Sequence, residues 1–158
     1  MSDDKIKIAV FPGSFDPFTI GHESVVMRAL DMFDKVIVGI GFNTTKVRFI
    51  PIEKSVEGIQ RVFKDTNGRV LVKVFKGLTV DFCKSEHSRY ILRGLRTAAD
   101  FEYERAIAQT NKAMYPEIET VFLLTLPQHT HVNSSIIREI IKQGGDASLF
   151  LPKEYKIT

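Results

Sequence analysis

The sequence predicts an α/β fold in which an open parallel sheet of five strands carries helices on both faces. Three observations lead to this expectation. Short β-rich segments alternate with helical segments over the whole chain, as in βαβ units. Residues 36–41 form a nearly continuous apolar run, which is typical of a strand buried on both faces. The 158 residues contain no repeat, low-complexity segment or linker, so a single domain over residues 1–158 is expected.

The first half of the chain predicts two strands and two helices. Residues 6–11 are short, β-rich and followed by Pro12-Gly13, which indicates a strand that stops before the turn. In residues 21–33 the apolar positions recur at helical spacing. The buried strand at 36–41 precedes a polar, basic loop, and a weaker helical pattern covers residues 52–65.

The middle of the chain predicts two more strands joined by a short helix. Asn67-Gly68 indicates a turn, and residues 70–75 then form the third strand. Residues 79–86 are expected to be a short helix with Thr79 as its N-cap. Residues 90–92 are the expected fourth strand.

The last part of the chain predicts a long helix, a strand and a final helix. Residues 98–114 have helical character up to the proline at position 116. Residues 120–126 are the expected fifth strand. Ser134-Ser135 then begins a helix with isoleucines along one face, and Gly144-Gly145 ends it.

Composition excludes several classes of protein. Cys83 is the only cysteine, so neither an internal disulfide nor a cysteine-based zinc site is expected. The 22 Lys and Arg exceed the 19 Asp and Glu by three and are scattered, so no nucleic-acid partner is expected. No apolar run approaches the roughly 18 residues of a membrane span. Residues 1–5 lack the pattern of a signal peptide. A cytoplasmic protein without a membrane partner is therefore expected.

Ligands of open parallel sheets bind beyond the carboxyl ends of the strands, and the segment after the first strand is the most informative. Gly13 permits a tight turn, Ser14 offers a hydroxyl, and His22 falls in the first turn of the next helix. A helix N-terminus favours phosphate, and an imidazole there can donate a hydrogen bond to a phosphoryl oxygen. A plain turn followed by a packed histidine is the alternative.

The second and fourth strand ends add cations. Lys46 and Arg48 lie in the loop after the second strand, where a solvated basic loop is the alternative. Arg93-Gly94-Leu95-Arg96 can form a clamp for phosphate, because guanidinium groups match its oxygens. Of Glu102 and Glu104 on the next helix, at most one is expected to face the same ligand, since they lie two positions apart.

The fifth strand end carries two histidines and a run of capping residues. One of Asn133-Ser134-Ser135 is expected to cap the last helix, and Arg138 is placed to neutralise an anion at that end. Plain N-capping is the alternative. His129 and His131 lack the neighbouring Cys or carboxylate that a dedicated zinc site needs, so none is expected.

The candidate residues indicate that the protein acts by orienting its substrates and by supplying positive charge. No residue pair suggests a covalent nucleophile with its base, and no Gly-x-x-x-x-Gly-Lys-[Ser/Thr] loop is present. The strand ends instead gather a His, a Lys and two Arg with two helix N-termini on one rim. This pattern fits a reaction in which one substrate attacks the other directly.

Two motifs carry a resemblance to known enzymes. Residues Gly13 to Pro17 with Thr19 to His22 resemble the (Thr/His)-x-Gly-His signature of the nucleotidyltransferase superfamily. Arg93 to Arg96 followed by Ala99 to Glu104 is more restrictive and resembles the family of bacterial phosphopantetheine adenylyltransferases. The resemblance runs from about residue 6 to residue 153. It implies a Rossmann-like nucleotidyltransferase domain over residues 1–158.

The resemblance implies a reaction in which 4′-phosphopantetheine attacks the α-phosphorus of ATP. The products are dephospho-coenzyme A and pyrophosphate, in coenzyme A biosynthesis, and the cofactor is Mg²⁺, whose ligands stay unassigned. It also implies a homo-oligomer, a hexamer in the family. One alternative is a sibling nucleotidyltransferase that uses nicotinate mononucleotide or a polyol phosphate. The other is a non-catalytic nucleotide-binding module.

The resemblance also assigns individual roles. His22, Lys46 and Arg93 match catalytic positions, and Ser14, Lys46, Thr79 and Arg93 match positions that bind 4′-phosphopantetheine. The positions that match ATP-binding residues are Ser14, Phe15, His22, Gly94, Leu95, Arg96, Glu104, His129, Thr130, His131, Val132, Asn133, Ser134 and Ser135.

The chain departs from the family pattern at several places. One is its end at Thr158, shortly after Leu151-Pro152, where many relatives add a C-terminal helix. Ser14 stands where Thr is commoner and keeps the hydroxyl. Lys54-Ser55 stands where the family commonly has a Glu-Arg pair, so the salt bridges around the loop of Lys46 are expected to differ. His129 and Asn133-Ser134-Ser135 replace an aromatic residue and a run of three Ser/Thr.

Overall fold

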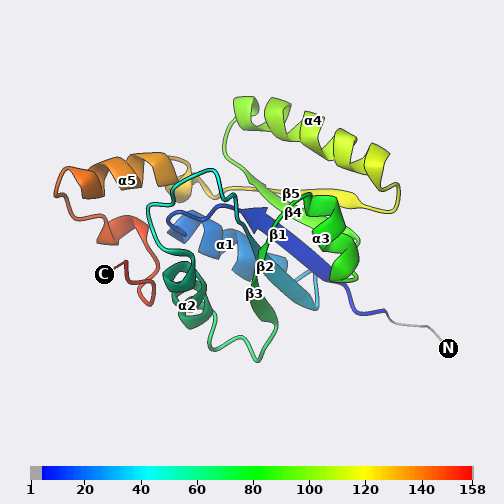
Figure 1. Ribbon diagram of the computed structural model, residues 1–158, viewed down its shortest axis with the longest axis horizontal. Helices are drawn as coiled ribbons and strands as arrows, with labels where there is room; N and C mark the ends of the chain where they lie inside the picture. The colour runs from blue at the N-terminus through cyan, green and yellow to red at the C-terminus, as the bar shows by residue number, and fades with distance from the viewer. Residues whose placement is uncertain (1–4, 158) are drawn as a thin grey trace.

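The computed structural model describes residues 5–157, which form a parallel sheet with helices on both faces (Figure 1). The strand order is β3-β2-β1-β4-β5, and the predicted fold class is confirmed. The strands are β1 (Ile8–Gly13), β2 (Lys35–Gly41), β3 (Val70–Phe75), β4 (Tyr90–Leu95) and β5 (Glu119–Leu124). The helices are α1 (Ile20–Ala29), α2 (Ile52–Val62), α3 (Thr79–Ser85), α4 (Ala98–Met114) and α5 (Ser134–Lys142), with 3-10 turns at Pro127–His129 and Ser148–Phe150. Residues 1–4, on which part of the argument against a signal peptide rests, lie outside the described residues.

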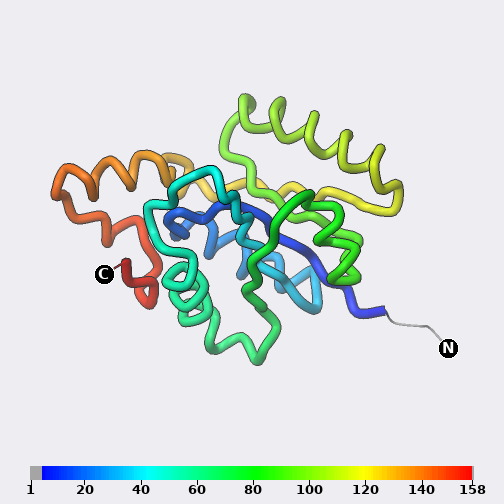
Figure 2. The backbone as a smooth tube through the Cα atoms, viewed as in Figure 1, coloured from blue at the N-terminus to red at the C-terminus, as the bar shows by residue number. Residues whose placement is uncertain are grey.

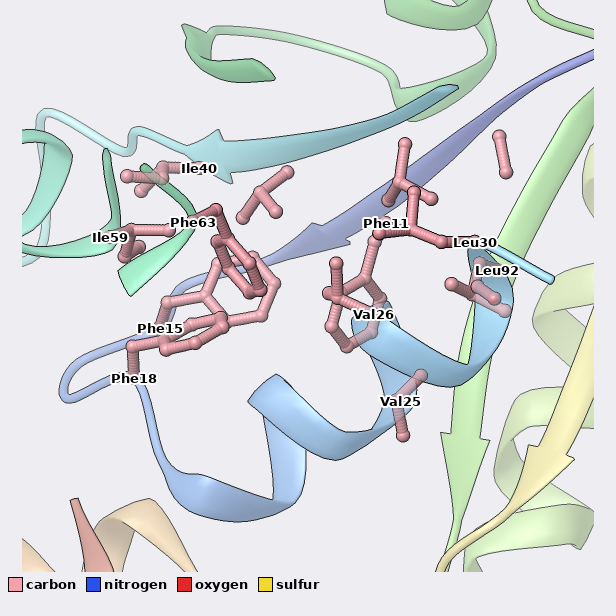
Figure 3. Close-up of a cluster of buried hydrophobic side chains, with 14 of the residues drawn as sticks. Phe11, Phe15, Phe18, Val25, Val26, Leu30, Ile40, Ile59, Phe63 and Leu92 are labelled. Atoms are coloured by element: carbon pink, nitrogen blue, oxygen red, sulfur yellow. The ribbon is translucent and has the colours of Figure 1, made fainter. Parts of the chain in front are cut away.

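Successive residues of the central strands point to opposite faces of the sheet and so build two cores. Phe11 of β1 lies in one cluster with Val26 of α1 and Ile59 of α2 on one face (Figure 3). Val10 packs with Phe82 of α3 on the other face. Because both faces are covered, β1 and β2 are buried along most of their length, as a near-continuous apolar run predicts.

The two halves of the sheet separate at the carboxyl end of β1. This strand pairs with β2 along its whole length but with β4 only at Ala9 and Val10. Pro12 belongs to the strand, although the sequence predicted an end before it. Its carbonyl faces β4, where it accepts a hydrogen bond from Arg93. The backbone nitrogen of Pro12, which has no hydrogen to donate, is on the same side, where β1 and β4 no longer pair. No hydrogen bond of the sheet is therefore lost at this proline. Figure 2 shows the segments after β1, β2 and β5 gathered near this end.

Two further predictions are corrected. The fourth strand does not stop at residue 92 but continues to Leu95, because β5 pairs with it residue by residue up to Leu124. Thr79 as the N-cap of α3 was wrong: Leu78 is the N-cap, with extended backbone, and no side chain caps this helix. Gly77, with a φ of 85°, turns the chain just before this N-cap, so the cap lies one residue earlier than expected.

The helix α4 lies outermost in the fold (Figure 1). Among its 17 residues only Glu104 is buried, while Phe101, Tyr103 and Ile107 are exposed. Glu104 attaches the first turns of this helix to Arg93 of β4. None of the described helices combines the length and the hydropathy that a bilayer span requires.

Gly39 of β2 offers a test of the packing on the α3 face. A Cβ there would lie 2.8 Å from the ring of Phe82 and 3.2 Å from the ring of Phe75, and these rings stack with centroids 4.5 Å apart. We expect Gly39→Ala to lower the free energy of unfolding in urea by about 1–3 kcal/mol, the range for an overpacked core. Gly41→Ala on the same strand is the matched control, because its Cβ would meet no atom closer than 3.7 Å. Equal losses in the two variants would contradict this packing argument.

Candidate active site

A cavity of about 570 Å³ lies where β1 and β4 separate. Its walls come from the loop after β1, the start of α1, β4 with the first turns of α4, and residues 125–138. The first turns of α1 and α5 both border it, through His22 and through Ser134 and Ser135. Helix N-termini carry unpaired N–H groups and a partial positive charge. Two of them around one cavity favour a polyphosphate ligand.

The start of α1 fixes His22 in one tautomer. Thr19 is the N-cap, and its Oγ1 accepts a hydrogen bond from the backbone N–H of His22. The backbone N–H of Thr19 in turn donates to Nδ1 of His22 at 3.0 Å. This is a capping box with a histidine in place of the usual Glu or Gln. Because Nδ1 accepts, a neutral ring carries its proton on Nε2. The sequence analysis missed the role of Thr19, which the Thr-x-x-His spacing could have indicated.

The ring of His22 is uncharged at neutral pH. Burial, together with the positive charges of Arg93 and Arg96, lowers the pKa of His22 to about 3. Phe15 and Phe11 pack against the ring edge-on, with centroids 5.0 and 6.1 Å away. His22 therefore offers the cavity a neutral Nε2–H donor in a fixed orientation, which is the arrangement that stabilises developing charge at least reorganisation cost.

Four carbonyl oxygens around the β1–α1 loop each accept a hydrogen bond from a side chain of another segment. Between them Phe15 has a φ of 46°, in the left-handed region that residues other than glycine seldom adopt. Because the carbonyl oxygens are bonded to donors, their negative ends are not left free beside an anion in the cavity. The pairs are Pro12 with Arg93, Ser14 with Arg48, Asp16 with Arg138, and Pro17 with Ser134.

Arg93 joins three elements at the floor of the cavity. Its Nε and Nη2 donate to the two carboxylate oxygens of Glu104 on α4, at 3.0 and 2.6 Å, and its Nη1 donates to the carbonyl of Pro12 on β1. These three bonds leave two of the five guanidinium N–H groups for a ligand, as far as the described residues go. The sequence allowed at most one of Glu102 and Glu104 to face the ligand of the arginines, and the structure places Glu104 against Arg93. Glu102 pairs instead with Arg105 on the helix surface.

Arg96 also lines the cavity and is held by two partners. Its Nε donates to Asp100 at 3.3 Å and its Nη1 donates to the carbonyl of Val132 at 3.3 Å. The N-cap of α5 is Asn133, whose Oδ1 accepts from the backbone N–H groups of Ser135 and Ile136. The sequence left this cap open among three residues, and the structure selects the first of them.

The structure brings most of the residues with predicted ATP contacts into this one cavity. His129 contributes an Nδ1 atom that is buried and has no hydrogen-bond partner among the described residues. Arg138 also lines the cavity, and so do Asp100 and Tyr103, which the sequence analysis did not select. The predicted residues that line it are Ser14, Phe15, His22, Arg93, Gly94, Arg96, Glu104, His129, Val132, Asn133, Ser134 and Ser135.

Five predicted residues lie elsewhere. Leu95, Thr130 and His131 are not among the lining residues, and the exposed ring of His131 faces Phe150. Thr79 lines a second cavity of about 530 Å³ near the ends of β2 and β3. Lys46 lines neither cavity and is exposed in the loop before α2. The roles assigned to these residues stay predictions.

The residues of the cavity do not form a cage for a metal ion. No group of three or more His, Cys, Asp or Glu side chains comes together within residues 5–157. The two carboxylates of the cavity, Asp100 and Glu104, are bonded to Arg96 and Arg93. Mg²⁺ is commonly held by substrate phosphates and water with few protein ligands. The side chains present thus fit a Mg²⁺ ion that arrives with a nucleotide, not a resident one.

The fold and the cavity define a nucleotidyltransferase of the cytidylyltransferase-like class, whose family model matches residues 10–140. The fold also resembles that of a bifunctional NMN adenylyltransferase/ADP ribose pyrophosphatase from Francisella tularensis. That structure has a TM-score of 0.71 and 18% sequence identity, and the match covers 95% of this chain and 46% of that one. At this identity the likeness concerns the fold alone.

Closer relatives identify the family. The phosphopantetheine adenylyltransferase of Cytophaga hutchinsonii is 51% identical over 151 residues, which cover 96% of this chain and 99% of the relative. The enzyme of the same name from Phocaeicola vulgatus is 48% identical over 94% of this chain and 97% of its own length. The chain belongs to the phosphopantetheine adenylyltransferase family.

The protonation of His22 can be followed directly by ¹⁵N NMR of the imidazole. Because the pKa is lowered to about 3, we expect the Nε2–H tautomer with no titration between pH 8 and pH 5, in roughly the range where an ordinary histidine would titrate. His22→Asn identifies the signals by their loss. The unfolded chain takes up this proton near the ordinary pKa, so this residue lowers stability as the pH falls below that value. A titration midpoint near the ordinary value would contradict the buried, neutral state.

Proposed function

We propose that this chain transfers the adenylyl group of ATP to 4′-phosphopantetheine. A phosphate oxygen of the acceptor forms a new bond to the α-phosphorus, the bond from that phosphorus to the bridging oxygen breaks, and pyrophosphate leaves with the electron pair. The products are dephospho-coenzyme A and pyrophosphate. The observation that carries the proposal is one cavity that joins a neutral Nε2–H donor, two arginines and two helix N-termini. The names of the relatives support the same reaction.

The proposed role of His22 is to donate a hydrogen bond to a non-bridging oxygen of the α-phosphoryl group. Charge on this oxygen grows in the transition state, so a fixed donor binds that state more strongly than the ground state. Thr19 holds the ring in the donor tautomer. Arg93, kept in place by Glu104, directs its remaining N–H groups to the acceptor phosphate. No covalent intermediate is required, and burial raises the pKa of Cys83 to about 12, which keeps that thiol unreactive.

The two cavities suggest where the two substrates bind. ATP occupies the larger cavity, with its phosphates between the first turns of α1 and α5 and near Arg96. The unpartnered Nδ1 of His129 then serves as a polar contact for the nucleotide. The acceptor extends from Ser14 toward the second cavity, which Thr79 lines, and Lys46 reaches its phosphate from the loop above. Mg²⁺ enters with ATP and supplies charge neutralisation for the phosphates.

We also propose a homo-oligomer in the cytoplasm. The support for an oligomer is the outer face of the fold, where Phe101, Tyr103, Ile107 and Leu124 are exposed on α4 and on the edge strand β5. Apolar groups gathered on a helix and an adjacent strand favour burial against another copy. Sedimentation of the purified chain at the monomer mass would contradict this assembly; the cytoplasmic location stays a prediction.

A substrate panel tests the proposed reaction. Purified protein with MgATP is offered 4′-phosphopantetheine, nicotinate mononucleotide and a polyol phosphate, and pyrophosphate release is measured with the product mass. We expect release with 4′-phosphopantetheine and a product of the mass of dephospho-coenzyme A, and none when Mg²⁺ is chelated. Turnover with either of the other acceptors alone would replace this function with a sibling activity. No turnover with any acceptor would favour a nucleotide-binding module.

His22→Ala tests the proposed donor. We expect kcat to fall by roughly 10²–10³, the range for losing one preorganised donor to a developing oxyanion. The affinity for MgATP, measured by calorimetry, should change far less, because the interaction is strongest in the transition state. His87→Asn is the control, since this histidine is exposed and lines neither cavity. Near-normal kcat in His22→Ala would remove the residue from the mechanism.

A further inference from the structure

The loop between β2 and α2 divides into a free part and a fixed part. Residues 43–47 are exposed, and Lys46 is one of them. Residues 48–50 are fixed, because Arg48 is only 12% exposed in its side chain and Ile50 is 2% exposed. The place from which Lys46 extends is therefore set by the contacts of the three residues that follow it closely in the chain.

Arg48 connects this loop to two other segments of the protein. Its Nη1 donates to the carbonyl of Ser14 at 2.8 Å, in the loop after β1. Its Nη2 donates to Oγ of Ser55 in α2 at 3.1 Å, and its Nε donates to the carbonyl of Ile50 at 3.0 Å. One planar guanidinium thus holds three chain segments in a fixed relation, which a lysine ammonium on a flexible stem does less well.

Asp16 completes the connection from the other side. Its two carboxylate oxygens accept the backbone N–H groups of Phe49 and Ile50, both at 2.8 Å. The carboxylate lies 3.8 Å from the guanidinium of Arg48, and both side chains are almost buried. Asp16 therefore fixes the backbone of the Lys46 loop, and Arg48 fixes the backbone of the Ser14 loop. The latch formed by Asp16, Arg48 and Ser55 ties these two loops together.

We propose that Arg48 is a positioning residue that sets how the enzyme grips the acceptor phosphate. This proposal rests on the proposed function, in which Ser14 and Lys46 both contact the phosphate of 4′-phosphopantetheine. These two residues stand on the two loops that the latch joins. Arg48 lines neither cavity, so it acts through the loops and not through contact with a substrate.

The environment of Ser55 fits this assignment. Its side chain is completely buried. The structure places the guanidinium of Arg48 against that serine. Arg48 thus supplies a positive group beside Asp16 at a place that is largely shielded from solvent.

The test is a set of variants measured with each substrate separately. We expect Arg48→Ala to reduce kcat/KM for 4′-phosphopantetheine by about tenfold to a hundredfold, the scale of a misplaced binding group. Calorimetric affinity for MgATP should change by less than about threefold, because most of the proposed ATP contacts lie outside the Ser14 loop, on β4 and around the first turn of α5. Arg48→Lys should fall between, and Lys46→Ala should show the same acceptor-side pattern. Val47→Ala is the control, since this side chain is fully exposed beside Arg48, and it should behave as the parent.

Hydrogen exchange gives a readout that does not depend on turnover. In Arg48→Ala the amides of Phe49 and Ile50 should exchange faster than in the parent, while the strands keep their protection. Equal losses for both substrates, or unchanged exchange of these amides, would overturn the positioning role. If the parent protein does not adenylylate 4′-phosphopantetheine, the proposed function fails, and the exchange data still decide whether the latch exists.

A double variant tests the chemistry of the latch itself. Arg48→Ala combined with Ser55→Arg returns a guanidinium to the cluster from α2. We expect this pair to recover most of the acceptor-side loss and the slow exchange of Phe49 and Ile50. A folded double variant that binds MgATP as the parent does but recovers neither would contradict the claim that a positive group at this place fixes the loop.

Discussion

The structure depends on the bridge that Arg93 makes across the opening between β1 and β4. The two strands pair only at Ala9 and Val10, and beyond that point the guanidinium connects the carbonyl of Pro12 to the carboxylate of Glu104. Where the two strands are too far apart for backbone hydrogen bonds, the guanidinium of Arg93 connects them instead. It keeps a cavity open at the point where the strand order reverses, and it fixes α4, which buries no other side chain.

Most of the positive charge around the cavity is already paired with acceptor groups of the protein. Arg93 and Arg96 each carry a carboxylate partner, Arg48 and Arg138 hold carbonyls of the β1–α1 loop, and the imidazole of His22 is neutral. The cavity therefore attracts phosphate through fixed N–H groups, and through those N–H groups of the arginines that are not bonded to other parts of the protein. Such donors need little rearrangement when charge develops on a ligand, which is the condition for stabilising a transition state.

The two sides of the cavity that we propose for the two substrates differ in construction. The proposed ATP side consists of helix starts and strand ends, with caps at Thr19 and Asn133. The proposed acceptor side includes an exposed loop whose Lys46 does not line the cavity. A latch of buried polar groups fixes that loop at one end and leaves its tip free to meet a substrate. Under the proposed function, this division would let the capped helix starts hold the nucleotide while the acceptor draws Lys46 into position.

The sequence by itself determined the fold class, the order of the elements and the segments that form the cavity, because local periodicity and turn residues dictate strands, helices and strand ends. His22, Arg93 and Asn133 could be selected in this way. Only the tertiary structure decided the extension of β1 through Pro12, the cap at Leu78, the pairing of Glu104 with Arg93, and the latch of Arg48 with Asp16. Asp16 and Arg48 lie more than thirty positions apart in the chain, so no local pattern links them. Their contact exists because the folded sheet brings two loops to the same edge, and long-range packing of this kind leaves no periodic trace in a single sequence.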